Sequence, residues 1–170
     1  MADSSRSPRL RDRAISGIGR GSGTERSEFE RLRDLPDKRI IGDIRLVQRS
    51  DISAAWEARD IPIVNAEGMD ARLTMQLVAE TGAKTLNVKI TGIGPICRLD
   101  VDGRPHRPAG RSHKHALRAA ACPRENLKRD VTDRGDLNGR SLQEVFEAFC
   151  RMAHIDHEGA LIVPPDVNGM

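Results

Sequence analysis

Apolar and polar residues alternate most regularly between residues 69 and 101. Met69 to Val78 has an apolar residue at nearly every second position, and Lys84 to Ile90 repeats this period. Side chains of a β-strand point alternately to opposite faces, so each segment predicts a strand with one buried and one solvent-facing side. Thr81-Gly82-Ala83 predicts the turn of a hairpin between them. Ile96 to Val101 has the same pattern and predicts a third strand.

A helical period appears near the end of the chain. Ser141 to His154 predicts a helix, because its apolar residues recur at spacings of three and four and include two of the three phenylalanines. Ser141 and Glu144 have the spacing of a capping box at its first turn. We expect this helix to cover the inner face of the sheet. Residues 25–35 predict a shorter helix that Pro36 ends.

The remaining segments have weaker patterns. Short apolar runs predict strands at 44–47 and 61–64, and residues 53–59 suggest a helical turn or a bulged connection. Residues 112–117 predict a fourth strand, whereas the polar segment 122–140 suggests a long surface loop. Together these segments predict an α+β fold, an antiparallel β-meander of four to six strands packed by a C-terminal helix.

The organisation of the chain follows from composition. Residues 1–24 are rich in Ser, Gly and Arg and carry the whole net charge of +3, which predicts a disordered basic arm. Residues 25–158 predict a single α+β domain, and residues 159–170 a loose tail with two prolines. The net charge of zero outside the arm means that the pI of about 9.0 does not identify the folded part as a nucleic-acid binder.

Composition excludes several classes of protein. Aromatic residues make up 2% of the chain, which argues against a sheet that binds RNA by stacking bases on aromatic side chains. No apolar run approaches the roughly 20 residues that a transmembrane helix needs, and the N-terminus has no signal-peptide pattern, so we expect a cytoplasmic protein without a membrane partner. The three cysteines lack C-x-x-C spacing and are expected to be reduced. We expect Cys97 and Cys150 to pack inside and Cys122 to be the reactive thiol.

Histidines form two groups, and the first lies in the most basic stretch of the domain. Residues 104–118 contain five cations and no acid, around His106, His113 and His115. On the predicted fourth strand His113 and His115 share one face, and His106 can fold back beside them. Arg98 and Asp100 point to one face of the neighbouring strand. His154 and His157, by contrast, lie at the end of the predicted helix, where the helix dipole favours positive charge.

Two chemistries fit this cluster. The first is metal-independent cleavage of RNA, with His113 and His115 as acid and base and Asp100 orienting an imidazole. The expected catalytic residues are therefore His106, His113, His115 and Asp100, and the expected phosphate-binding residues are Arg98, Arg104, Arg107 and Lys114. The second chemistry is Zn²⁺ binding by His106, His113 and His115. The plain alternative is a solvated polar face with no chemistry.

One longer motif carries a resemblance. Arg98-Leu99-Asp100-Val101-Asp102-Gly103-Arg104-Pro105-His106, then His113-Lys114-His115, then a helix with a Phe-Cys pair at 149–150, resembles a group of uncharacterised bacterial and phage domains with the pattern R-x-D-x-x-G-x-P-H and H-x-H. These domains are similar to small proteins of toxin–antitoxin-like gene pairs. The resemblance covers residues 69–155. Here a short Pro-Ala-Gly segment separates the histidines, where the family pattern has a longer Asn-Pro-Asp-Gly loop.

The resemblance implies a small toxin-like protein of a mobile element, with an antitoxin protein and RNA as its partners. A non-enzymatic phage or prophage protein that captures a host protein or nucleic acid is the alternative, and a zinc-binding structural domain is a further one. The metal-independent scheme needs no cofactor, whereas the structural domain needs zinc.

Overall fold

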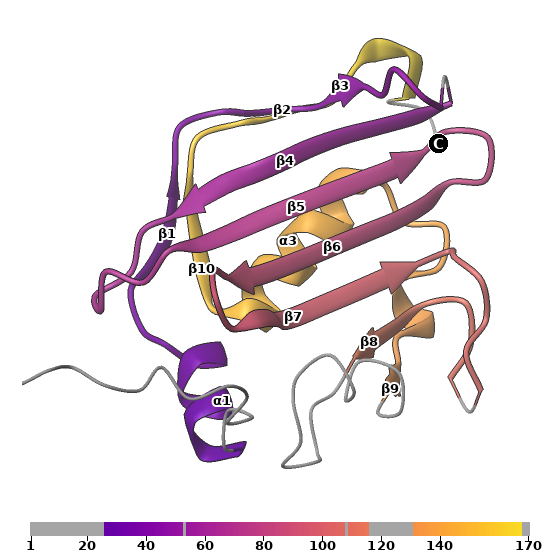
Figure 1. The fold of residues 1–170 in the computed structure, drawn as a ribbon. Coiled ribbons are helices and arrows are strands. Elements are labelled where there is room, and N and C mark those ends of the chain that lie inside the picture. Colours follow the sequence, from indigo (N-terminus) through magenta and orange to yellow (C-terminus); the bar gives the residue numbers. More distant parts are fainter. Residues whose placement is uncertain (1–25, 53, 108, 116–130, 168–170) are drawn as a thin grey trace, which may run out of the picture.

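A seven-stranded β-sheet forms the centre of the computed structural model (Figure 1), which describes residues 26–52, 54–107, 109–115 and 131–167. The strand order is β3-β4-β5-β6-β7-β8-β9, and every neighbouring pair is antiparallel. In chain order the strands are β3 (Val47–Gln48), β4 (Ala55–Ile63), β5 (Ala71–Val78), β6 (Ala83–Ile90), β7 (Gly94–Val101), β8 (His113–His115) and β9 (Val131–Asp133). The predicted α+β class is confirmed, with seven strands in this sheet instead of four to six.

Strands β5, β6 and β7 form where the sequence alternates most regularly. On β5, Leu73, Met75 and Leu77 are buried, whereas the residues between them are partly exposed. The hairpin register pairs Met75 with Leu86, so the buried residues of both strands lie on one face. This face is the inner side of the sheet.

Helix α3 (Leu142–Ala153) covers the inner face, behind the strands in Figure 1. Its first turn has the predicted capping box, since Ser141 accepts from the backbone of Glu144 and Glu144 accepts from the backbone of Ser141. Phe146 and Phe149 are both buried in the hydrophobic core with the inner residues of the strands. The prediction of this helix and of its packing is confirmed.

Four short strands lie outside the main sheet and pair in parallel. β1 (Lys38–Ile41) pairs with β10 (Ile155–Glu158), and β2 (Ile44–Arg45) pairs with β11 (Leu161–Ile162). The prediction of a loose tail from residue 159 is therefore wrong for β11, which is held by backbone hydrogen bonds to a segment more than 100 residues away. Helix α1 (Arg26–Arg33), the 3-10 turn η1 (Gly135–Leu137) and the 3-10 turn η2 (Pro165–Val167) complete the elements.

Two further predictions need correction. Most of residues 53–59 belong to β4 and form neither a helical turn nor a connection, because this segment pairs with β5 through a bulge between Ala58 and Ile61. Residues 131–133 of the predicted surface loop form the edge strand β9, which pairs with β8. The proposed basic arm at 1–24 and Cys122 lie outside the described residues.

The cysteines within the described residues are packing residues. Cys97 and Cys150 are both free and buried, and burial raises the pKa of the Cys150 thiol to about 12. Burial also raises the pKa of Cys97. Neither thiol is therefore a nucleophile at neutral pH. None of the helices in the described part of the chain has the length and apolar character needed to cross a bilayer.

Candidate functional site

The strand register gathers polar side chains on the outer face of the sheet, away from α3. Thr85 on β6 pairs with Asp100 on β7, Asp100 pairs with His113 on β8, and His113 pairs with Asp133 on β9. Directly opposed residues point to the same face. These four side chains therefore form one row across four strands, and the pair Arg98–His115 lies beside it.

Asp100 is the centre of this polar group. Its carboxylate accepts hydrogen bonds from Nε2 of His115 at 2.9 Å, from Oγ1 of Thr85 at 2.8 Å and from Nε of Arg98 at 3.1 Å. Burial alone would raise the pKa of Asp100, but the hydrogen bond from His115 and the charge of Arg98 outweigh it and hold the pKa well below the ordinary value. Asp100 is therefore a carboxylate that only accepts hydrogen bonds, so His115 donates.

The loop between β7 and β8 folds back over the histidines. Its ends are joined by the hydrogen bond from the Gly103 N–H to the carbonyl of Arg111. The carbonyl of Gly110 accepts both the backbone N–H of His106, at 3.3 Å, and Nδ1 of His113, at 3.2 Å. The ring of His106 consequently stacks on that of His113, with 4.6 Å between their centroids. The predicted return of His106 to the other two histidines is present in the structure.

The loop buries two of the three histidines. His113 is 1% exposed and His115 is 3% exposed, whereas His106 is exposed. The alternative of a solvated polar face is therefore wrong for His113 and His115. Ala109 of the loop is also buried, and the backbone N–H of Gly110 donates to Asp133 on β9, which holds the loop against the sheet. Only His106 presents its ring to solvent.

His113 has one ring nitrogen engaged and one without a partner. Because a carbonyl only accepts, Nδ1 donates its proton to Gly110. Nε2 is buried, has no hydrogen-bond partner among the described residues, and lies 3.5 Å from Oδ2 of Asp100. Burial lowers the pKa of His113, the neighbouring imidazoles lower it further, and Asp100 opposes this effect. The imidazole of His113 is therefore neutral near pH 7, with its lone pair on Nε2.

A small pocket opens beside the cluster. Its volume is about 240 Å³, which suits a phosphate group or a hydrated ion better than a whole nucleotide. The residues that line it come from β6, β7, β8 and the loop, namely Thr85, Arg98, Asp100, Gly103, Arg104, His106 and His113. Arg98 is partly neutralised by Asp100, whereas Arg104 makes no ion pair with the described residues. The pocket therefore combines two guanidinium groups with two imidazoles.

Three predicted site residues lie apart from the pocket. His115 is held by Asp100 and does not line it. Lys114 pairs with Leu99 and so points to the opposite face of the sheet, which removes it from the expected phosphate-binding set. Arg107 is exposed on the loop and does not line the pocket either. One ring nitrogen each of His106, His113 and His115 lies within 4.8 Å of the others, so these three residues are the candidate metal ligands.

Three residues that position the site were not predicted from the sequence. Thr85 donates to Asp100, Gly110 holds two histidines through its carbonyl, and Asp133 holds Gly110. The alternating pattern of β6 places Thr85 on the outer face. Pairing this strand with the predicted strand at 96–101 could therefore have placed Thr85 beside Asp100. Gly110 and Asp133 had no such signal, because their contact depends on β9, which the sequence did not indicate.

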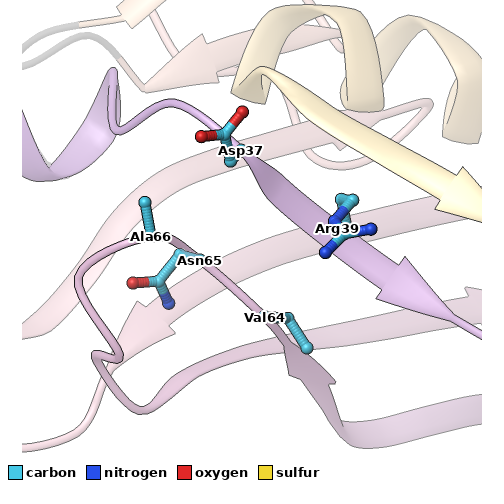
Figure 2. A pocket seen from close by; sticks show the side chains of 5 residues that line it. All are labelled: Asp37, Arg39, Val64, Asn65 and Ala66. Carbon is cyan, nitrogen blue, oxygen red and sulfur yellow. The ribbon is translucent and has the colours of Figure 1, made fainter.

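A second pocket, at the β1 end of the molecule, differs in composition and geometry. Figure 2 shows its five lining side chains pointing in different directions, and none of them is a histidine. Its amide, Asn65, is occupied in closing a turn, with hydrogen bonds to the backbone of Ile63 and Met69. The side chains that line the second pocket therefore do not converge on one position where a ligand could bind.

Comparisons of this chain with protein-family models, with curated proteins and with solved structures gave no match.

Proposed function

We propose that this protein cleaves RNA at the pocket beside the three histidines, without a metal ion. The observation that carries the proposal is the exposed imidazole of His106 stacked on the buried imidazole of His113, next to the guanidinium groups of Arg98 and Arg104. Cleavage of an RNA phosphodiester needs a base, an acid and a positive charge for the phosphorane, and these four side chains supply all three.

Arg98 and Arg104 bind the phosphate in this scheme. Arg104 comes from the loop and Arg98 from β7, so the two guanidinium groups approach the pocket from different elements. Asp100 forms hydrogen bonds to Arg98 and to His115 and so fixes the orientation of both. In the proposal Asp100 and His115 are positioning residues and do not touch the RNA.

His106 and His113 carry the protons in the proposal, and the exposed ring of His106, which stacks on His113, turns aside so that RNA reaches the buried Nε2 of His113. The neutral imidazole of one removes the proton from the ribose 2′-hydroxyl, whose oxygen attacks the phosphorus, and the protonated imidazole of the other gives a proton to the leaving 5′-oxygen. The products are a 2′,3′-cyclic phosphate and a 5′-hydroxyl end. This assignment replaces the pair His113 and His115, because His115 does not line the pocket.

The test is an assay of purified protein on a mixed-sequence single-stranded RNA in the presence of EDTA, with DNA of the same sequence as a second substrate. We expect cleavage of RNA alone, with 2′,3′-cyclic phosphate ends. His106→Ala should lower the rate by about 10²–10⁴-fold, the usual range for one proton-transfer group. His154→Asn is the matched control, because it removes an exposed imidazole at the C-cap of α3, where asparagine tolerates the left-handed backbone. RNA left intact by the wild type, or cut equally by His106→Ala, would overturn the proposal.

The cellular setting that we propose is a toxin-like protein of a mobile element or toxin–antitoxin-like gene pair, paired with an antitoxin. Its support is the resemblance of the R-x-D-x-x-G-x-P-H and H-x-H motif to such proteins. Expression of the wild type should then stop growth, and His106→Ala should relieve it. Growth inhibition that survives in His106→Ala would favour capture of a host protein or nucleic acid instead.

A further inference from the structure

The buried contact between His113 and Asp100 leaves two acceptors facing each other. Nε2 of neutral His113 presents a lone pair, since Nδ1 donates its proton to Gly110. This lone pair lies 3.5 Å from the carboxylate oxygen of Asp100, and among the described residues no donor reaches it. A buried acceptor without a donor is costly, and two of them side by side also repel each other. A cation between or beside them would remove both costs.

The surrounding side chains supply further donors for such a cation. His106 and His115 each offer a ring nitrogen, and these nitrogens and that of His113 lie within 4.8 Å of one another. Imidazoles bound to one tetrahedral Zn²⁺ at about 2.0–2.1 Å have nitrogens roughly 3.3 Å apart. His106 is exposed on its loop, so its ring is the one of the three that can move toward the two buried imidazoles.

We propose that His106, His113 and His115 bind a divalent transition-metal ion of the Zn²⁺ class, with Asp100 as the carboxylate that balances its charge. Imidazole nitrogen favours Zn²⁺, Cu²⁺ or Ni²⁺, whereas Mg²⁺ and Ca²⁺ prefer sets of oxygen ligands. A carboxylate beside a ligating histidine is a common feature of such sites, and Asp100 lies beside His115 in this way. Nε2 of His115 donates its proton to Asp100 without the ion, so binding through Nε2 would displace this proton.

The ion would also regulate the proposed cleavage, and this part of the inference rests on the proposed function. A lone pair that binds a metal cannot take up a proton. Zinc on His106 and His113 would therefore withdraw both imidazoles from proton transfer, and the ion would act as an inhibitor. Binding itself does not depend on the proposed function, because it is measured without RNA.

The first experiment titrates metal-free full-length protein with ZnCl₂ by calorimetry, and repeats the titration with MgCl₂. We expect about one Zn²⁺ per chain and no measurable Mg²⁺ binding. His106→Ala should weaken Zn²⁺ binding by at least about tenfold, the lower end of the effect seen when a metal site loses a supporting group. His154→Asn should bind as the wild type does. Since His106 is an exposed loop residue, its variant is expected to fold, which a circular dichroism spectrum checks.

A melting curve provides the second measurement. An ion that binds only the folded protein raises the Tm, and the rise grows with its concentration. Zn²⁺ should therefore raise the Tm of the wild type and of His154→Asn, and should raise that of His106→Ala much less. Absence of Zn²⁺ binding in the wild type, or equal binding by His106→Ala, would overturn the metal site.

The cleavage assay separates this inference from the proposed function. RNA cleavage in EDTA that one equivalent of Zn²⁺ suppresses supports both. Zinc binding without any RNA cleavage keeps the metal site and overturns the nuclease. RNA cleavage by a protein that binds no zinc keeps the nuclease and overturns the metal site. Cleavage that requires added zinc overturns the inhibitory role and the metal-independent scheme together.

Discussion

The two faces of the seven-stranded sheet hold their side chains by different means. On the inner face, Leu73, Met75, Leu86 and Leu99 pack under α3 and need only to be apolar and of suitable size. On the outer face, Asp100 is held by directional hydrogen bonds from β6, β7 and β8. The inner face therefore tolerates exchange of one apolar residue for another, whereas the outer face depends on specific donors and acceptors.

The two faces of the sheet therefore contribute differently to the stability of the fold and to its chemistry. Apolar burial under α3 supplies free energy of folding and offers no reactive group. The outer face contains the buried carboxylate and the imidazoles, whose cost of burial is offset only by their mutual contacts. Substitutions on the inner face should therefore change the free energy of unfolding most, and substitutions at the pocket should change activity most.

The largest effect on stability is expected on the inner face. Phe149 is fully buried on α3, so Phe149→Ala should lower the free energy of unfolding by roughly 3–5 kcal/mol. Urea titration followed by far-UV circular dichroism measures this change. Phe149→Leu, which keeps most of the volume, is the matched control and should cost less. A loss below about 1 kcal/mol for Phe149→Ala, smaller than any usual Phe→Ala change in a core, would mean that α3 is peripheral to the fold.

An intermediate effect is expected where the outer face is covered by the loop. His113→Ala removes a buried ring that donates to Gly110, so the free energy of unfolding should fall by about 1–3 kcal/mol. His106→Ala removes an exposed ring of the same type and should change it by less than about 0.5 kcal/mol. Urea titrations of both variants make the comparison. Equal effects of the two substitutions would contradict the burial of His113.

Much of the fold could be predicted from local patterns. Strands β5, β6 and β7 could be located because one face of each is apolar and the other polar, and α3 could be located from its capping box and apolar stripe. The parallel pairs could not, because β1 and β2 meet partners more than 100 residues later in the chain. Two prolines after residue 162 suggested a loose tail, yet the pairing of β11 lies just before them.

The sequence could predict which residues form the candidate site, but it could not predict that they are buried. A period of two places Arg98 with Asp100 and His113 with His115, and strand pairing then joins the two sets. The cover over these residues depends on Gly110, which the distant Asp133 holds. No local sequence pattern indicates that contact, so the sequence could not show that the two histidines are covered. In the proposed catalytic pair His106 therefore takes the place of His115, since among the three histidines only His106 presents its ring to solvent.

A smaller effect is expected from lowering the pH, which protonates Glu144 in the first turn of α3. The backbone N–H and the hydroxyl of Ser141 hydrogen-bond to the carboxylate of Glu144 and lower its pKa below the ordinary 4.5. This contribution to stability is complete above the ordinary pKa and is lost as the pH falls through the lower value in the folded protein. Glu144→Gln should therefore unfold at lower urea than the wild type near pH 7, and the difference between the two should shrink as the pH falls through the lowered pKa of Glu144. A difference that does not change with pH would contradict the role of the carboxylate charge.

The smallest effect is expected at the second pocket. Arg39 lines it and forms an exposed ion pair with Glu158 at 3.2 Å, and exposed pairs of this kind contribute about 0.2–1 kcal/mol. Arg39→Ala should therefore barely change the urea midpoint. It removes one positive charge, as Arg104→Ala does at the candidate site, so both variants lose the same long-range attraction for RNA. Arg104→Ala should lower RNA cleavage by about 10²–10³-fold if its guanidinium stabilises the phosphorane, whereas Arg39→Ala should retain the wild-type rate. An equal loss in both would mean that RNA responds to the charge of the protein as a whole, and the pocket beside His106 would then have no special part in cleavage.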